Sequence, residues 1–270
     1  MQVAILGLGA IGTLVARTLE GHATVTGIDR TKAPVRRDAP PVDVAIVTVK
    51  ARGTAWAAET AARIIAPDGI VLTIQNGLGH QERLAAAVGP QRVAVGVIYV
   101  GASLEGGELR STGPGRVELG RAAHIDDLAA LLVAGGMGAR VVLDPWPAVW
   151  RKLVGNAAVN PVTAIVGCLN GELSAHPASR LADGAAVETA RVATADGVAI
   201  PDEEATRLWR AMADLTAANP SSMLQDVRAG RPTEIEAITG EVVRRGAAHG
   251  VATPVSSALL RLVEVLEANT

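Results

Sequence analysis

Lys152, Asn156 and Asn160 stand four residues apart in a segment that is otherwise rich in Leu, Val and Ala. In an α-helix, which advances about 100° and 1.5 Å per residue, their side chains form one polar stripe roughly 12 Å long. A buried cation and two carboxamides need hydrogen-bonding partners, which a polar small molecule can supply. We therefore interpret the stripe as the wall of a ligand site. The alternative is a solvated outer face, where long charged residues are more usual than paired asparagines.

A glycine motif near the start of the chain indicates dinucleotide binding. It follows a short apolar run and precedes an apolar helical segment. The first glycine allows a tight turn, the second lets the backbone approach a pyrophosphate, and the third lets helix and strand pack closely. An ordinary glycine turn is the alternative, because the motif alone is a weak signal. The predicted cofactor-binding residues of this motif are Gly7, Leu8, Gly9, Ala10, Ile11 and Gly12.

Asp29 and Arg30 follow the second predicted strand and indicate opposite cofactor preferences. An acid at this point hydrogen-bonds the adenosine ribose diol of NAD, whereas an arginine accommodates the 2′-phosphate of NADP. Lys32, Arg36 and Arg37 add positive charge, and guanidinium groups suit phosphate geometry; a solvated loop is the alternative for the two arginines. We favour NADP(H) as the cofactor, and Asp29 leaves NAD(H) as the alternative.

Lys50 and Asn76 each follow a predicted strand. Ligands of open α/β sheets lie at the carboxyl ends of the strands, so both side chains are candidates for contacting cofactor and substrate. The Asn76-Gly77 pair is also typical of an ordinary turn, which is the alternative for this asparagine.

Ser222 and Glu234 are further candidates in the C-terminal part of the chain. Ser221 and Ser222 precede one helical pattern, and Thr233 and Glu234 follow a proline before another, so any of the four could cap a helix. Together with the polar stripe and the asparagine of the Asn-Gly pair they would complete one polar site. We therefore include Ser222 and Glu234 in that site.

The elements that must position these residues change in character along the chain. Up to about residue 143, short β-branched runs alternate with alanine-rich helical stretches, which predicts a mostly parallel sheet with crossover helices. Beyond Pro145 and Pro147 the pattern is helical. We predict an α/β fold, with a Rossmann-type doubly wound domain over residues 1–144 and an all-helical domain over residues 145–270. The predicted strands cover residues 3–6, 24–28, 44–49, 70–74, 93–100, 117–119 and 139–143, and a helix covers residues 126–135.

The composition limits the classes of function. The chain has 270 residues, 49% hydrophobic and 19% charged, which is typical of a soluble protein with a substantial core. A net charge of -2 gives no electrostatic reason to expect nucleic acid or a membrane as a partner. Cys168 is the only cysteine, so we expect a reducing, cytoplasmic setting and a packing role for its thiol. We expect no bound metal ion.

Taken in order, the motifs resemble those of the ketopantoate reductase (2-dehydropantoate 2-reductase) family. They are GLGAIG, VKA, QNGLG, WRKLVGNAAVNPVTAIVGCLNGEL, SSMLQD and PTEIEAITG, and the resemblance runs from Gly7 to about Pro254. It implies an N-terminal Rossmann domain followed by a helical domain of the 6-phosphogluconate dehydrogenase C-terminal type. It also implies NADPH-dependent reduction of the C2 ketone of ketopantoate to (R)-pantoate, a step towards pantothenate and coenzyme A.

The resemblance also implies roles for residues of this sequence. The predicted catalytic residues are Lys152, which corresponds to the catalytic lysine, and Glu234, which corresponds to the acidic residue of the substrate site. Arg30 and Lys50 match nucleotide-binding positions. The expected reaction is hydride transfer to the ketone carbon, with the lysine donating a proton to the oxygen, where negative charge develops. The polar residues that match substrate-binding positions are Asn76, Asn156, Asn160 and Ser222.

Two features depart from the family pattern and leave other functions open. Only twelve residues separate Arg30 from Asp43, where family members carry a longer segment, and residues 96–102 are more apolar than is usual. A diverged relative acting on another 2-keto acid is therefore one alternative. A β-hydroxyacid dehydrogenase is a second, because that superfamily also places an asparagine four residues after a lysine, but it does not explain SSMLQD or TEIEAITG. A dinucleotide-sensing protein without catalysis is a third, and either a monomer or a homodimer is compatible with the sequence.

Overall fold

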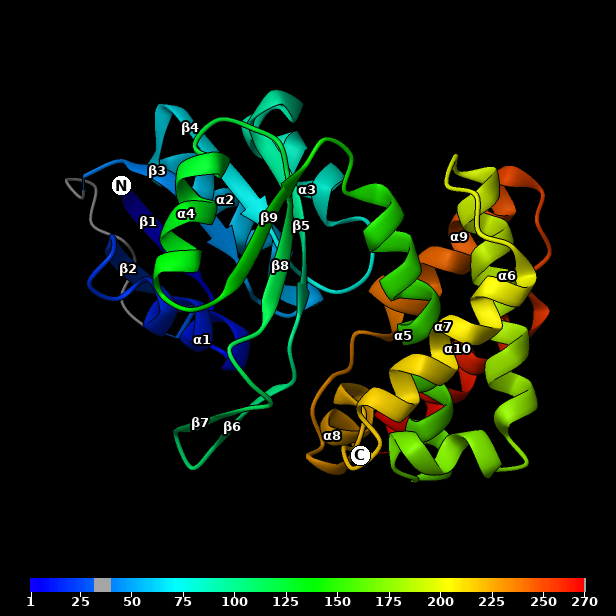
Figure 1. The fold of residues 1–270 in the computed structure, drawn as a ribbon. Coiled ribbons are helices and arrows are strands. Elements are labelled where there is room, and N and C mark those ends of the chain that lie inside the picture. Colours follow the sequence, from blue (N-terminus) through cyan, green and yellow to red (C-terminus); the bar gives the residue numbers. More distant parts are fainter. Residues whose placement is uncertain (32–39, 270) are drawn as a thin grey trace. The chain divides into compact units, whose positions relative to one another are not determined.

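A computed structural model describes residues 1–31 and 40–269 (Figure 1). The chain forms two compact units. The first comprises residues 1–75 and 79–145, and the second comprises residues 76–78 and 146–270. The sequence predicts a boundary between residues 144 and 145, and it gives no sign that residues 76–78 pack with the second unit.

The first unit is built on a seven-stranded sheet with the strand order β2-β1-β3-β4-β5-β8-β9. Neighbouring strands are parallel except for β5 and β8. β2 pairs on one side of β1 and β3 pairs on the other, which makes the edge between β1 and β3 a topological switch point, the usual place for a ligand in such sheets. The strands are β1 (Gln2–Leu6), β2 (Thr24–Ile28), β3 (Val42–Val47), β4 (Ile65–Thr73), β5 (Val93–Tyr99), β8 (Arg116–Gly120) and β9 (Gly138–Val142).

Helices cover both faces of this sheet, which confirms the predicted doubly wound α/β fold (Figure 1). Alternate residues of β1 enter opposite apolar clusters: Val3 and Ile5 pack with α1 and α4, whereas Ala4 and Leu6 pack with α2 and α3. Both faces of the strand are buried, so its sequence shows no polar alternation. The helices are α1 (Ala10–Leu19), α2 (Thr54–Ile64), α3 (His80–Val88) and α4 (Ile125–Ala134).

A β-hairpin that the sequence does not predict lies between β5 and β8. β6 (Ala102–Glu105) pairs antiparallel with β7 (Glu108–Ser111), and Gly106 and Gly107 form the turn with positive φ angles. The hairpin packs beside α1. Each of its strands has only four residues, too few to show a periodic pattern beside the surrounding glycines.

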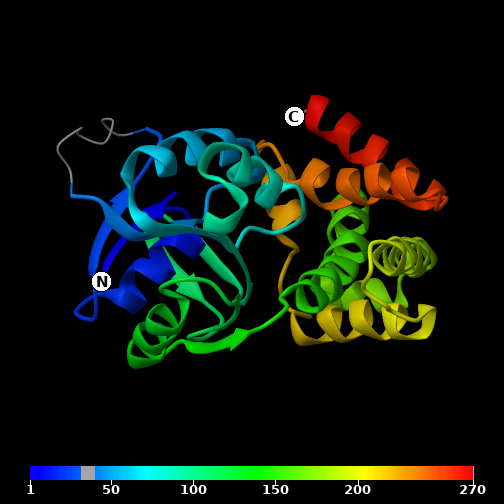
Figure 2. The ribbon, with the colours of Figure 1, turned by 90° about the horizontal axis from the view of Figure 1, so that it is seen from above.

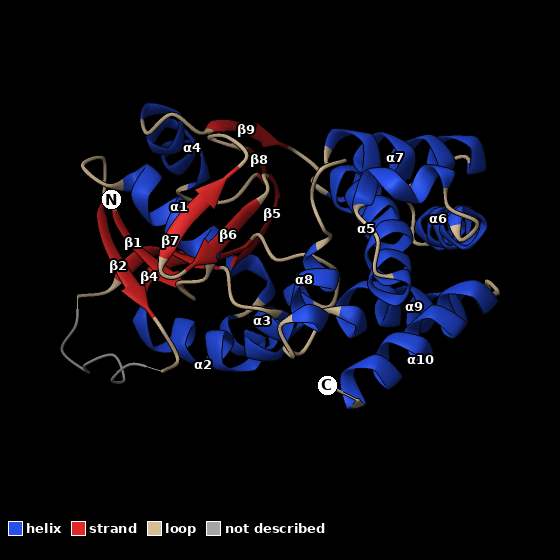
Figure 3. Cartoon of the chain, turned by 90° about the horizontal axis from the view of Figure 1, so that it is seen from below, coloured by secondary structure: helices blue, strands red, loops and turns tan. Residues whose placement is uncertain are grey.

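The second unit is helical in its described residues, as predicted, and Figure 3 shows the strands confined to the first unit. α5 packs against four of the other helices, α6, α7, α8 and α10. Small residues allow close approach: a Cβ on Gly155 of α5 would lie 2.5 Å from Cε of Met212 on α7. The helices are α5 (Trp146–Val166), α6 (Ser179–Ala195), α7 (Asp202–Leu215), α8 (Ser222–Arg228), α9 (Glu241–His249) and α10 (Pro254–Ala268).

A π-helix over Glu236–Gly240 leads directly into α9, and α10 packs against both (Figure 2). Short π-helical turns are rare and are frequent at functional sites. None of the helices in the described part of the chain has the length and apolar character that a membrane span requires.

Candidate functional site

The polar stripe lies on α5, and its two asparagines are buried. Asn156 is 8% exposed and Asn160 is 5% exposed, among apolar residues that are also buried. Lys152 is partly exposed. A solvated outer face is therefore the wrong interpretation for the two carboxamides. Their burial is costly without polar partners, which is the physical argument for a ligand at this face of α5.

Lys152 has an altered acidity. Partial burial removes water from its ammonium group and lowers its pKa to about 8, and the charge of Glu234 opposes part of that shift. Desolvation disfavours the ammonium, whereas a nearby carboxylate favours it. Glu234 is 7% exposed, so water screens its charge poorly. The result is a lysine that is protonated at neutral pH and gives up its proton more readily than an exposed lysine, as a general acid must.

Backbone contacts position Glu234. The backbone N–H of Thr233 donates to Oε1 of Glu267 on α10 at 2.7 Å, and Oγ1 of Thr233 accepts from the N–H of Ile235 at 3.1 Å. The carbonyl of Glu234 accepts from the N–H of Ile238 at 3.0 Å. Thr233 thus makes the local hydrogen bond expected of a capping residue, and the carboxylate of Glu234 acts on Lys152.

Ser221, rather than Ser222, caps α8. Oγ of Ser221 accepts from the N–H of Leu224 at 3.1 Å and from Oγ1 of Thr163 on α5 at 2.7 Å. Ser222 is the first residue of α8 and is exposed. The capping alternative is therefore correct for Ser221, while substrate binding by Ser222 stays a prediction.

Asn76 packs with the helical unit, although the residues on both sides of 76–78 belong to the first unit. Gly77 has a φ of +90°, as a turn requires, and the N–H of Leu78 donates to the carbonyl of Ala237 at 2.9 Å. The backbone thus forms the expected turn, and Asn76 still belongs to the same unit as the other candidate site residues. Asn76, Lys152 and the other predicted substrate-binding residues all lie in one compact unit.

The glycine motif has the geometry that dinucleotide binding requires. Gly7 has a φ of +107°, and a Cβ there would lie 2.6 Å from Cγ1 of Val49, while a Cβ on Gly12 would overlap the carbonyl of Gly7. At Gly9, by contrast, no heavy atom of the described residues, apart from those of its sequence neighbours, lies within 4 Å of the Cβ position, and no side chain caps the N-terminus of α1. This open space and the N–H groups of the first helical turn fit a pyrophosphate. Of the other residues of the motif, Leu8 lies in the connection between β1 and α1, and Ala10 and Ile11 are the first two residues of α1.

The predicted nucleotide-binding residues outside the glycine motif follow β2 and β3. Oδ1 of Asp29 accepts from the N–H and from Oγ1 of Thr31, both at 2.8 Å. These bonds orient the carboxylate at the end of β2, where the adenosine ribose of a bound dinucleotide would lie. Arg30 and Lys50 are exposed at the ends of their strands. The cations that lie outside the described residues are Lys32, Arg36 and Arg37.

The sequence does not predict a partly buried network of hydrogen bonds around Gln75. Nε2 of Gln75 donates to the carbonyl of Val49 at 2.8 Å and to Oγ1 of Thr54 at 3.0 Å. Oε1 of Gln75 accepts from Oγ1 of Thr73 at 3.0 Å, and Oγ1 of Thr54 lies 3.1 Å from Nδ1 of His80. The network joins the residue before Lys50 to the residue before Asn76. The available signal was the pair of polar residues that flank the Asn-Gly-Leu-Gly turn.

Cys168 has the properties of a packing residue. Burial raises the pKa of its thiol, and the charge of Glu172 raises it further. A thiol of raised pKa is a poor nucleophile, which agrees with the packing role expected from the sequence.

Comparisons with known proteins cover both units. Residues 32–124 match the family model described as ketopantoate reductase PanE/ApbA, and residues 145–267 match the model of its C-terminal part. The 2-dehydropantoate 2-reductase of Halobacterium salinarum is 34% identical to this chain over 303 aligned residues, and the alignment covers 99% of each protein.

Solved structures show the same architecture. A ketopantoate reductase of the PanE/ApbA family from Ralstonia eutropha JMP134 has a TM-score of 0.89 at 28% identity, and the match covers 100% of this chain and 99% of that one. D-mandelate dehydrogenase in complex with NADH has a TM-score of 0.90 at 26% identity, with the same coverage. Both family models and a near-full-length relative thus agree with the fold and the motifs, and the chain belongs to the ketopantoate reductase family.

Proposed function

We propose that this protein reduces 2-dehydropantoate to (R)-pantoate with NADPH, a step towards pantothenate and coenzyme A. The observation that carries the proposal is the similarity, over 99% of the chain, to a protein named 2-dehydropantoate 2-reductase. The chemistry of the candidate site supports it. 2-Dehydropantoate presents a ketone, a carboxylate and a hydroxyl, and the unit that holds Lys152 also holds the asparagines and the acid that could bind them.

A nicotinamide dinucleotide, when bound, supplies the hydride for such a reduction. Gly7, Gly9 and Gly12 would hold its pyrophosphate, and Arg30 and Lys50 would contact the nucleotide. We favour NADPH because a guanidinium at the end of β2 suits a 2′-phosphate. Asp29 keeps NADH as the alternative, and the D-mandelate dehydrogenase of similar fold is described in complex with NADH.

Lys152 would provide the proton. Its ammonium donates a hydrogen bond to the ketone oxygen and transfers a proton as negative charge develops there, so the interaction is stronger in the transition state than in the ground state. A pKa of about 8 keeps the group protonated at neutral pH and makes it a stronger acid than an ordinary lysine. Glu234 raises this pKa and so helps Lys152 to recover its proton after each turnover.

The buried carboxamides would orient the substrate. An asparagine side chain carries two N–H donors and one carbonyl acceptor, so Asn156 and Asn160 can bind both a carboxylate and a hydroxyl. Their burial strengthens these bonds because little water competes for them. Asn76 and Ser222 would complete the set of substrate contacts.

Steady-state reduction of 2-dehydropantoate tests the proposal. The substitution Lys152→Ala should lower kcat by roughly 10²–10⁴-fold and leave the affinity for NADPH unchanged, because general acid catalysis contributes factors of that size. Arg151→Ala is the matched control, since Arg151 pairs with Glu204 at 2.7 Å and has no assigned role in the site. An unchanged kcat in the lysine variant would remove Lys152 from the mechanism, and a wild-type protein without turnover of 2-dehydropantoate would refute the function.

The cofactor preference has its own test. We expect wild-type protein to use NADPH with a lower KM than NADH, and Arg30→Ala to raise the KM for NADPH while leaving that for NADH unchanged. Asp29→Asn should not impair NADPH use. A strong preference of the wild-type protein for NADH would show that Asp29 outweighs Arg30.

A second candidate is the interconversion of another 2-hydroxy acid and its 2-keto acid, and the similarity to D-mandelate dehydrogenase favours it. A panel with D-mandelate and other 2-hydroxy acids separates the two, since the preferred substrate has the higher kcat/KM. Oxidation of 3-hydroxyisobutyrate without activity on 2-dehydropantoate would instead indicate a β-hydroxyacid dehydrogenase. Binding of the dinucleotide without turnover of any substrate would indicate a sensor.

Two further expectations complete the proposal. The protein is a monomer or a homodimer, which light scattering decides. The single cysteine, Cys168, predicts a cytoplasmic location, which fractionation of cells that produce the protein would test.

A further inference from the structure

Gly77 and Leu78, which follow Asn76, contact the backbone of the π-helix. The N–H of Leu78 donates to the carbonyl of Ala237, the second residue of the π-helix, at 2.9 Å. A Cβ on Gly77 would overlap this carbonyl oxygen and would lie 2.6 Å from the carbonyl carbon. The two stretches of backbone therefore touch directly, and no side chain at position 77 fits between them.

Leu78 fixes the same contact through its side chain. It is 3% exposed and belongs to the apolar cluster that includes Trp150 and Leu153 of α5. These residues flank Lys152 in sequence. The segment that carries Asn76 is thus held by a backbone hydrogen bond to the π-helix and by apolar packing with the cluster of the helix that carries the lysine.

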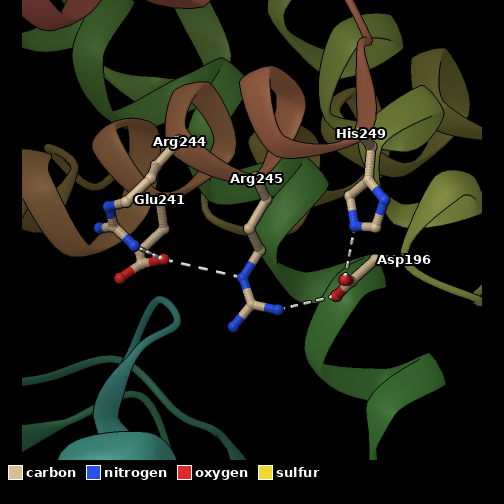
Figure 4. Close-up of polar contacts among 5 residues, drawn as sticks. All are labelled: Asp196, Glu241, Arg244, Arg245 and His249. Carbon is tan, nitrogen blue, oxygen red and sulfur yellow. Dashed lines mark hydrogen bonds and ion pairs between the residues drawn. The ribbon is translucent and has the colours of Figure 1, made fainter.

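The π-helix is itself held firmly at both ends. Before it, the N–H of Thr233 is bound by Glu267 of α10. After it, Glu241 is buried and forms ion pairs with Arg244 and Arg245, the latter at 3.7 Å. Figure 4 shows Arg245 between Glu241 and Asp196. Asp196 follows the last residue of α6, and its carboxylate also lies 3.1 Å from Nε2 of His249. Through Arg245 and His249 the network ties α9 to the end of α6. The π-helix, which carries the Ala237 carbonyl, is therefore fixed by contacts on both sides.

We propose that Gly77 is a positioning residue: the absence of a side chain there allows the contact with Ala237 that places Asn76 in register with Glu234 and Lys152. Asn76 directly precedes Gly77 in the sequence, and Glu234 lies three residues before Ala237. A shift of the contact therefore changes the spacing of Asn76 from Glu234. The inference rests on the proposed function, because it concerns the geometry of that site.

The substitution Gly77→Ala tests this, with Gly197→Ala as the matched control. Both glycines lie in the helical unit and have similar φ angles, +90° and +97°. At Gly197, however, no heavy atom of the described residues, apart from those of its sequence neighbours, lies within 4 Å of the Cβ position. The two variants carry similar backbone strain, and only the first displaces a neighbour. We expect Gly77→Ala to lower kcat by about 10²-fold, the usual effect of a misplacement near 1 Å, while the KM for NADPH stays unchanged. Gly197→Ala should keep the wild-type kcat.

A double-mutant cycle shows whether Gly77 acts through Asn76. If it does, adding Gly77→Ala to Asn76→Ala should lower kcat little further, because the side chain to be positioned is already absent. An equal loss of kcat in both backgrounds would overturn the proposal. So would a Gly77→Ala variant with wild-type kcat.

Amide hydrogen exchange keeps the inference testable apart from catalysis. The Leu78 amide should be protected in the wild-type protein and should lose protection in Gly77→Ala, whatever substrate the enzyme uses. An unprotected Leu78 amide in the wild-type protein would overturn the proposal, whereas protection without turnover of any keto acid would refute the proposed function alone. If Gly77→Ala does not fold, Leu78→Ala loosens the same segment without steric overlap. It should give the same loss of kcat and the same lack of additivity with Asn76→Ala, and a wild-type kcat in that variant would overturn the proposal.

Discussion

The acidity of Lys152 makes the pH profile the sharpest test of the proposed mechanism. Its pKa of about 8 results from burial, which lowers the pKa, and from Glu234, which raises it. Ketone reduction requires the protonated lysine, so kcat/KM for the keto acid, which reports the pKa before the substrate binds, should be level below this pKa and fall above it. With a pKa near 8, roughly nine-tenths of the lysine is protonated at pH 7 and roughly one-tenth at pH 9, which predicts about a tenfold decrease in kcat/KM over that interval.

The assay is the initial rate of NADPH consumption from pH 6 to pH 10, with the keto acid concentration varied to give kcat/KM. The reverse reaction provides an internal check, because oxidation of the hydroxy acid requires the neutral amine and its kcat/KM should rise with pH and level off above about pH 8. The residual activity of Lys152→Ala should show no decrease as the pH rises through 8. If that variant keeps the same decrease in kcat/KM above pH 8, another group causes the decrease, and the assignment of Lys152 as the proton donor is wrong.

Three further predictions follow from the structure. Glu234→Gln should move the alkaline decrease of kcat/KM to lower pH, because it removes the charge that raises the lysine pKa; a decrease that stays at the same pH would contradict this coupling. Gly9→Ala should weaken NADPH binding at least tenfold, because the added Cβ would enter the pyrophosphate position. It should leave the melting temperature unchanged, because the Cβ has open space in the protein itself. Fluorescence titration measures the first effect and thermal unfolding the second. Arg245→Met should lower the free energy of unfolding by about 2–3 kcal/mol, because Glu241, which is only 3% exposed, loses one of its two cationic partners. Arg261→Met removes a more exposed ion pair and should leave the free energy of unfolding in urea near that of the wild-type protein.

Much of the fold is predictable because apolar periodicity records burial. The β1 strand and the α1 helix follow from an apolar run, three glycines and an apolar helical pattern, and the structure gives each glycine of the motif a distinct steric reason. The hairpin of β6 and β7 is not predictable in this way. Its strands are short and mostly exposed, so few of their side chains carry the burial pattern by which strands are recognised.

The candidate site was predictable in its residue types and less so in their surroundings. Spacing alone indicates that Lys152, Asn156 and Asn160 share one face of a helix, but it does not distinguish a buried face from a solvated one. That distinction depends on the helices packed around α5, which come from residues far along the chain. The roles of Ser221 and Ser222 likewise depend on where α8 begins, and helix ends are the least certain part of a sequence-based assignment.

The contact at Gly77 shows why some determinants of a site leave so little trace in a sequence. A side chain that positions another residue is visible as a residue type, such as a buried acid or an amide. Here the positioning groups are a backbone N–H and a backbone carbonyl, which every residue but proline possesses, and the only mark in the sequence is a glycine that also suits an ordinary turn. The steric requirement appears only when residues 77 and 237 are seen in contact. A glycine in an Asn-Gly turn should therefore be examined for the backbone it faces before its function is ascribed to the turn alone.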